Sequence, residues 1–106
     1  MPKSLDTIIL EKARIYIANP ATWTWGANAR DRRGREVHPR DARAVRFCAL
    51  GACRRAAADI AAPEKIYLDA SSRLTRAARG KPVYVVNDTE GQAATIALFD
   101  RVLAQE

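Results

Sequence analysis

The segment from residue 45 to residue 57 constrains the fold of this chain most strongly. Its sequence, Val-Arg-Phe-Cys-Ala-Leu-Gly-Ala-Cys-Arg-Arg-Ala-Ala, has no proline and is rich in alanine, the residue with the highest helix propensity. We therefore expect a central helix that begins after an N-cap at Asp41 and ends before Pro63. Glycine costs ~1 kcal/mol in a helix relative to alanine, so Gly51 indicates a close backbone contact. One face of this helix carries small side chains and allows a second helix to approach: Val45, Cys48, Ala49, Ala52 and Ala56.

Two further helices are predicted on either side of the central one. The first spans residues 5–18, with Ser4 as its N-cap, and it ends before Pro20 because the residue that precedes a proline avoids the helical region. The next helix has Pro63 in its first turn and is closed by Gly80.

The C-terminal part of the chain predicts a short strand followed by a last helix. Residues 83–86 (Val-Tyr-Val-Val) form a β-branched run that is typical of a buried strand. Asn87 and Glu90 have the spacing of a capping box, so the last helix is expected to run from residue 88 to residue 104.

A small β element is also predicted between the first helix and the central one. Residues 22–25 (Thr-Trp-Thr-Trp) alternate as in an extended strand, residues 31–34 predict a turn, and residues 35–38 can return as a second strand. At a spacing of two, Trp23 and Trp25 share one face of the strand, which we expect to contact the core. The chain is thus predicted to be mainly α (α+β): a compact bundle of about four helices with a short β-hairpin or small β element, in a single domain spanning residues 1–106.

The charge of the chain is concentrated in arginines. The net charge is +6, and seven of the 14 arginines lie between Arg30 and Arg46, where Asp31, Glu36 and Asp41 offset part of it. An arginine-rich segment suits contacts with phosphate, carboxylate or nucleic acid. The alternative is a solvated loop with local ion pairs and no specific acidic partner.

The two cysteines indicate neither a disulfide nor a metal site. On one helix, Cys48 and Cys53 would point about 140° apart and lie more than about 7 Å apart along the axis, too far to bridge. With a single histidine and no zinc-ligand spacing, no metal and no cofactor are expected, and both thiols are interpreted as small apolar core residues. The sequence has neither a signal peptide nor an apolar run of the roughly 20 residues that cross a bilayer, so we expect a cytoplasmic protein without a membrane partner.

Three segments together resemble a known family. They contain Trp23-Thr-Trp-Gly26-Ala27, Phe47-Cys48-Ala49 and Val86-Asn87-Asp88. Their order and spacing are similar to those of a family of small proteins with a domain of unknown function, seen in bacteria and their phages, with Trp-x-x-Gly-Ala, Trp-Cys-Leu and Trp-Asn-Asp motifs. In this chain Phe47, Ala49 and Val86 stand where the family has Trp, Leu and Trp. The resemblance covers residues 23–57 and 85–103, and it implies no particular chemistry.

The function favoured by these patterns is a small non-enzymatic binding or accessory module. It would recognise an acidic partner through the Arg/Trp loop, the central helix and the start of the last helix, with arginine forks and a tryptophan anchor. Asp88 is expected to pair with Arg30 or Arg55, although the Asn87-Asp88 pair can equally serve only as a helix cap. The predicted binding residues are Trp23, Trp25, Arg30, Arg43, Arg46, Arg55, Asn87 and Asp88.

Two other classes of function stay open. A nucleic-acid-binding protein would place arginines of the loop and of the central helix along a phosphate backbone: Arg32, Arg33, Arg35, Arg43, Arg46 and Arg54. A cysteine-dependent hydrolase would use Cys48 as nucleophile, His38 as base and Asp88 or Asn87 as the orienting group. The difficulty for the hydrolase is that Cys48 is expected inside a helix, where burial raises the pKa of its thiol. The sequence therefore favours a protein that is not an enzyme.

Overall fold

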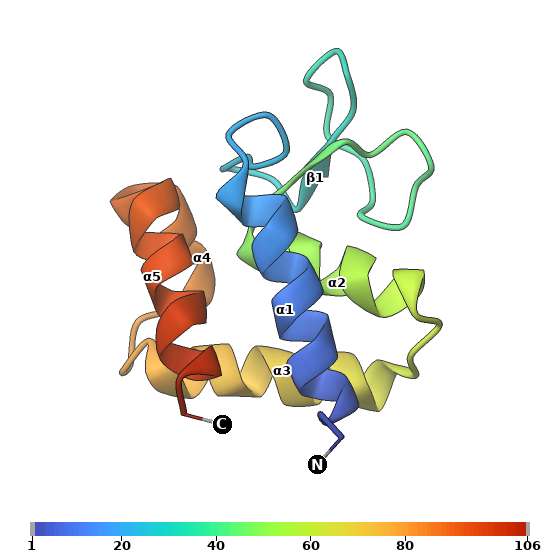
Figure 1. The fold of residues 1–106 in the computed structure, drawn as a ribbon. Helices are drawn as coiled ribbons and strands as arrows, with labels where there is room; N and C mark the ends of the chain where they lie inside the picture. Colours follow the sequence, from blue (N-terminus) through green and yellow to red (C-terminus); the bar gives the residue numbers. More distant parts are fainter. Residues whose placement is uncertain (1, 106) are drawn as a thin grey trace.

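The computed structural model describes residues 2–105 of the chain, which form five α-helices, one π-helical turn and a two-stranded antiparallel sheet. In Figure 1 the third helix crosses one end of the molecule, and the loops between the first and second helices gather at the opposite end. The helices are α1 (Leu5–Ala18), α2 (Ala49–Asp59), α3 (Glu64–Ala77), α4 (Val83–Val85) and α5 (Gln92–Leu103), with the π-helix η1 (Val86–Glu90) before α5, and the strands are β1 (Ala29–Arg30) and β2 (Arg46–Phe47). The prediction of a mainly helical chain with a small β element is confirmed, but the helices number five instead of about four.

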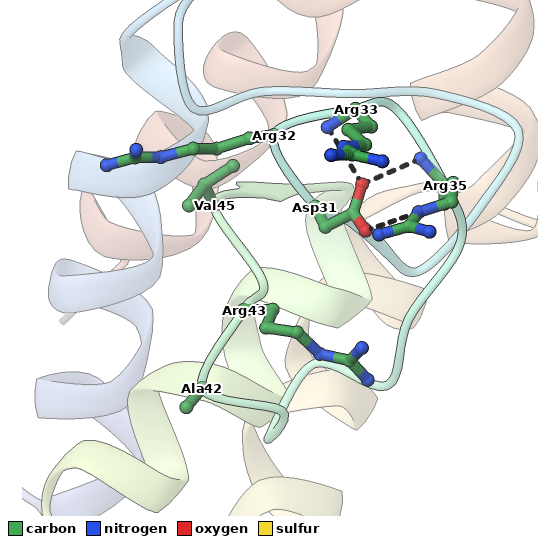
Figure 2. A pocket seen from close by; sticks show the side chains of 7 residues that line it. All are labelled: Asp31, Arg32, Arg33, Arg35, Ala42, Arg43 and Val45. Atoms are coloured by element: carbon green, nitrogen blue, oxygen red, sulfur yellow. Dashed lines mark hydrogen bonds and ion pairs between the residues drawn. The ribbon is translucent and has the colours of Figure 1, made fainter.

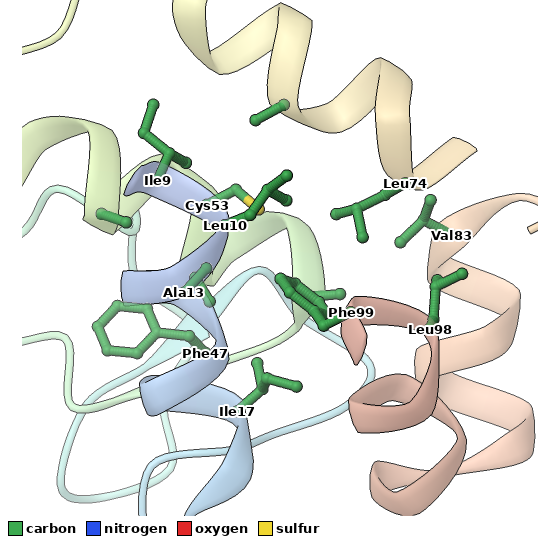
Figure 3. Packing of buried hydrophobic residues seen from close by; sticks show 14 of the residues in the cluster. Ile9, Leu10, Ala13, Ile17, Phe47, Cys53, Leu74, Val83, Leu98 and Phe99 are labelled. Carbon is green, nitrogen blue, oxygen red and sulfur yellow. The ribbon is translucent and has the colours of Figure 1, made fainter. Parts of the chain in front are cut away.

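The hydrophobic core lies between α1 and the helices α2, α3 and α5. Ser4 caps α1 as predicted, since its Oγ accepts a hydrogen bond from the backbone N of Thr7. Figure 3 shows Phe99 of α5 in the middle of the packed side chains, and Phe47 lies against the side of α1. The thiol of Cys53 is buried in the same cluster, as expected for a small apolar side chain.

The central helix starts later than predicted. Asp41 does not cap it; Cys48 is the N-cap, and α2 begins at Ala49. Two preceding residues pair with distant backbone instead of turning into helix: Val45 N donates to Arg30 O at 2.9 Å, and Phe47 N donates to Thr22 O at 2.8 Å. β-branched and aromatic side chains favour such extended pairing, and the burial of the Phe47 ring stabilises it.

The predicted pairing of residues 22–25 with residues 35–38 is wrong. β1 pairs with β2, while the two predicted strands contribute only the isolated bridges Trp23–Phe47 and Arg30–Glu36. The turn predicted at residues 31–34 is present, because Gly34 N donates to Asp31 O at 3.0 Å.

The strand predicted at residues 83–86 is also wrong, since this segment is helical. Val83 and Val86, three residues apart, are buried together on one helical face, whereas Tyr84 is 60% exposed. Asn87 consequently lies inside η1 and does not cap α5; Gly91, with φ of +94°, takes the N-cap position.

Two kinds of feature are absent from the described residues. None of the helices in residues 2–105 combines the length and the apolar character that a membrane span requires. The same residues contain no group of three or more histidine, cysteine, aspartate or glutamate side chains placed to hold a metal ion.

Candidate functional site

The loop between β1 and β2 forms an open surface cavity of about 370 Å³, which we call the arginine cavity. Figure 2 shows its walls, which come from the turn at residues 31–35 and from the segment 42–45. The lining residues are Asp31, Arg32, Arg33, Arg35, Ala42, Arg43 and Val45.

Asp31 organises one wall of the arginine cavity. It is only 5% exposed, and its Oδ1 accepts hydrogen bonds of 2.9 Å from the backbone N of both Arg33 and Arg35. Its Oδ2 accepts from Arg35 Nε at 2.9 Å. Burial alone would raise the pKa of Asp31, but the hydrogen bonds from Arg35 and Arg33 outweigh it and hold that pKa below its usual value. Asp31 is therefore ionised at neutral pH and fixes the Arg35 guanidinium in place (Figure 2).

Asp41 fixes the Arg43 guanidinium on the other wall of the arginine cavity. Its carboxylate accepts from the backbone N of Arg43 at 2.8 Å and from the guanidinium at 3.0 and 2.8 Å. These hydrogen bonds hold the pKa of Asp41 well below its ordinary range. Arg55 of α2 supports this turn from beneath, because its Nη1 donates to Pro39 O at 3.0 Å and to Asp41 O at 3.2 Å.

Four arginines of the loop have no partner for their guanidinium groups within residues 2–105: Arg32, Arg33, Arg40 and Arg46. All four are exposed, and the first two line the arginine cavity. The cavity thus presents two guanidinium groups held by aspartates next to two that are free to bind an anion.

Arg30 and Trp23, two of the predicted binding residues, both make contacts within the fold. Arg30 donates from Nε to Thr24 Oγ1 at 3.1 Å, and from its two Nη atoms to Gly34 O at 3.0 Å and Trp25 O at 3.1 Å. Trp23 is half-buried against the core, as predicted. Trp25 does not share this position: it is 61% exposed.

Asn87 joins three distant parts of the chain. Its Oδ1 accepts from Trp23 Nε1 at 2.9 Å and from the backbone N of Ala49 at 3.0 Å. Its Nδ2 donates to Thr24 O at 3.0 Å and to Asp88 Oδ1 at 2.9 Å. The side chain is fully buried and connects the tryptophan loop, the start of α2 and η1.

The expected pair between Asp88 and an arginine is wrong. Asp88 Oδ1 accepts from the backbone N of Gly26 at 3.1 Å and from Asn87 Nδ2. Arg30 donates to the acceptors of its own loop, and Arg55 donates to two carbonyl groups and lies 3.5 Å from Asp59. Asp88 thus holds the Trp25–Gly26 turn.

A smaller cavity of about 210 Å³ lies at the start of α2. Cys48 opens onto it, and Asp88 and Asn28 are among its other lining residues. The Cys48 thiol accepts from the backbone N of Gly51 at 3.3 Å and donates to Asn28 Oδ1 at 3.7 Å. Its predicted placement inside a helix is wrong, because it stands at the helix N-terminus. The pKa of the thiol is nevertheless raised, chiefly by burial and also by the Asp88 carboxylate, against the backbone donors that lower it.

The three residues considered for a hydrolase are not brought together. Cys48 and Asp88 line the same cavity, whereas His38 is not among its lining residues. The His38 ring is exposed, and its Nδ1 accepts from the backbone N of Arg40 at 3.0 Å.

Arg32 and Arg33 were predicted as contacts for nucleic acid alone and were not among the binding residues of the favoured function. Their signal is local: they occupy the two central positions of the Asp31–Gly34 turn, where side chains point outward. Asn28 was missed as well. Its carbonyl oxygen lies where a Cβ on Gly51 would approach to 1.8 Å, so the predicted close contact of this glycine is confirmed with a partner that only the structure identifies.

Comparison with protein families identifies a match over almost the whole chain. A family model described as "Family of unknown function (DUF6197)" matches residues 1–105. No curated protein and no solved structure matches the chain. The match confirms the resemblance to a domain of unknown function that the sequence indicated.

Proposed function

The chain belongs to the DUF6197 family, a family of unknown function. We propose that it is a small binding module whose arginine cavity holds an acidic segment of a partner protein. The observation that carries the proposal is the pairing of fixed and free guanidinium groups around one cavity. Arg35 and Arg43 are oriented by aspartates, while Arg32 and Arg33 extend without partners in the described chain.

The charge of the site supports a short acidic ligand. Asp31 and Asp41 neutralise two of the four arginines, which leaves two positive charges at the cavity. Two carboxylates of a peptide balance that charge, and each matches a guanidinium fork in bidentate geometry. Single exposed ion pairs contribute only about 0.2–1 kcal/mol, so the affinity depends on both free arginines acting on the same ligand.

The test is a titration of a labelled glutamate-rich peptide followed by fluorescence anisotropy. The double substitution Arg32→Ala/Arg33→Ala removes the free forks without breaking a contact of the fold, and we expect about tenfold weaker binding. The matched control Lys3→Ala/Lys65→Ala removes the same charge from exposed positions near α1 and α3 and should bind as the wild type does. Equal binding by both double variants would refute the proposal.

Nucleic acid is the second candidate ligand. The exposed ring of Trp25 and the unpartnered Arg46 favour it, because a base can stack on the indole while arginines contact phosphates. Binding to single- or double-stranded nucleic acid that falls steeply with salt, and that is lost in an Arg32→Ala/Arg33→Ala/Arg46→Ala variant, would replace the peptide proposal. No binding in about 50 mM salt would exclude this candidate.

A cysteine hydrolase receives less support from the geometry. The thiol of Cys48 faces a cavity, but the residues that line this cavity include no base of the histidine type. A thiol that reacts rapidly with a disulfide reagent at neutral pH in the folded protein would revive this alternative, whereas a slow reaction is expected from its raised pKa.

A further inference from the structure

A second group of arginines lies where the C-terminal ends of α3 and α5 meet. Arg73, Arg76, Arg79 and Arg101 line a cavity of about 230 Å³, which we call the helix-end cavity, together with Ala77, Val102 and Gln105. Figure 1 places these helix ends at the opposite end of the molecule from the loops that form the arginine cavity. No aspartate or glutamate is among the described residues that line it, and within residues 2–105 an ion pair is seen for one of its four arginines, Arg73 with Asp6.

Two of these four arginines are fixed by the fold. Arg73 Nη1 donates to Asp6 Oδ2 at 3.0 Å and to Thr7 Oγ1 at 2.8 Å. Arg101 Nη1 donates to the carbonyl oxygen of Ala77 at 2.8 Å, which satisfies a backbone acceptor at the end of α3.

The other two arginines are available. Arg76 and Arg79 are exposed, and their guanidinium groups have no hydrogen bond or ion pair to the rest of residues 2–105. The nearby Glu90 pairs with Lys81 at 2.9 Å, so it is already bound elsewhere. The C-terminal end of a helix carries partial negative charge, which opposes the binding of an anion. At the end of α3 two backbone carbonyl groups already have donors: Arg101 donates to Ala77 O, and the backbone N of Ala78 donates to Leu74 O.

We propose that the helix-end cavity binds a phosphate dianion, either free phosphate or a phosphate monoester group. Guanidinium forks match phosphate oxygens in bidentate geometry, and the two available forks, those of Arg76 and Arg79, provide more donors than a single carboxylate can accept. The arginine cavity carries less uncompensated charge, since aspartates pair with two of its four arginines, whereas Asp6 pairs with one of four at the helix-end cavity. The proposal is independent of the acidic-peptide site.

The test is an NMR titration of the isotope-labelled protein with inorganic phosphate, at an ionic strength kept constant with chloride. We expect saturable shifts of the backbone signals of Ala77, Val102 and Gln105. The variant Arg76→Ala/Arg79→Ala should bind at least about tenfold more weakly, whereas Arg32→Ala/Arg33→Ala should keep the wild-type affinity at this cavity. A parallel titration with a phosphoserine peptide identifies the source: tighter binding than inorganic phosphate indicates a phosphorylated partner, and equal or weaker binding indicates free phosphate.

A single substitution separates ligand binding from folding. Arg79 has a φ of +54°, a left-handed conformation that glycine adopts without strain. Arg79→Gly should therefore unfold at the same or a higher denaturant midpoint while it binds phosphate more weakly. Shifts that do not saturate, or an unchanged phosphate affinity in Arg76→Ala/Arg79→Ala, would overturn the proposal. Neither outcome affects the glutamate-peptide test, which reports on the other end of the molecule.

Discussion

At the scale of single residues, Asn87 is the polar side chain whose loss we expect to destabilise the fold strongly. Its amide has two acceptor and two donor positions, and all of them are used by partners in the fold. Asn87→Ala would leave the indole N–H of Trp23, the backbone N of Ala49 and the carbonyl of Thr24 without a partner. We expect the free energy of unfolding to fall by about 3 kcal/mol in urea titrations. Thr89→Ala, an exposed change two residues away, should stay within about 0.5 kcal/mol of the wild type.

Asp31 gives the chain a specific dependence on pH. Its pKa in the folded state lies below the ordinary value of 3.8, so its stabilising contribution is present above pH 3.8 and is lost as the pH falls through the folded pKa. Asp31→Asn should therefore lower the free energy of unfolding at pH 7, and the difference from the wild type should shrink below pH 3.8.

The measurement for Asp31 is urea unfolding at pH 7, 5 and 3 for both proteins. Asp69→Asn is the control, because Asp69 forms an exposed pair with Lys65 on the surface of α3. If the free energies of unfolding of the wild type and Asp31→Asn differ as much at pH 3 as at pH 7, the stabilising contribution does not come from the ionised Asp31 carboxylate.

At the scale of elements, the start of α2 is held by contact between backbones. A Cβ on Gly51 would stand 1.8 Å from the carbonyl oxygen of Asn28, which is itself backbone and cannot rotate away. Gly51→Ala would ordinarily favour a helix by ~1 kcal/mol, yet here we expect a net loss of about 2 kcal/mol because the 26–29 loop must move. Ala58→Gly, an exposed change in the same helix, should cost about 1 kcal/mol. A raised unfolding midpoint for Gly51→Ala would show that the loop yields.

At the scale of the whole molecule, the loops and the helices should unfold together. Both tryptophans lie in the loop after α1, whereas far-ultraviolet circular dichroism reports on the helices, so the two signals test the prediction of a single domain. The unfolding curves from fluorescence and from circular dichroism should coincide. Phe99→Ala should lower the free energy of unfolding obtained from either curve by about 4 kcal/mol, since this ring is fully buried at the centre of the core (Figure 3). Ile15→Ala, at an exposed position of α1, should change the free energy of unfolding from either signal by no more than about 0.5 kcal/mol. A fluorescence transition that precedes the helical one would indicate that the loops unfold as a separate unit.

The features that the sequence determined by itself are those encoded within a few neighbouring residues. Ser4 caps α1 through an atom three residues away, and the Asp31–Gly34 turn closes on its own backbone. The close approach at Gly51 could be predicted because a glycine destabilises an alanine-rich helix unless its missing side chain makes room for a neighbour. Such signals depend on local geometry, which the order of residues fixes directly.

Only the tertiary structure decided where α2 starts and which arginines are free. Helix propensities differ by at most about 0.7 kcal/mol among ordinary residues. The burial of Phe47 and its backbone pairing to the loop outweigh the preference of residues 45–48 for a helix. Asn87, Arg30 and Arg55 are polar residues suited to binding a partner, but folding directs them to backbone groups of the chain itself: Asn87 and Arg55 to other segments, and Arg30 to its own loop. Those partners are set by tertiary packing, so the sequence could predict an arginine-rich binding loop but could not predict that Arg32 and Arg33 are the arginines left free at its cavity.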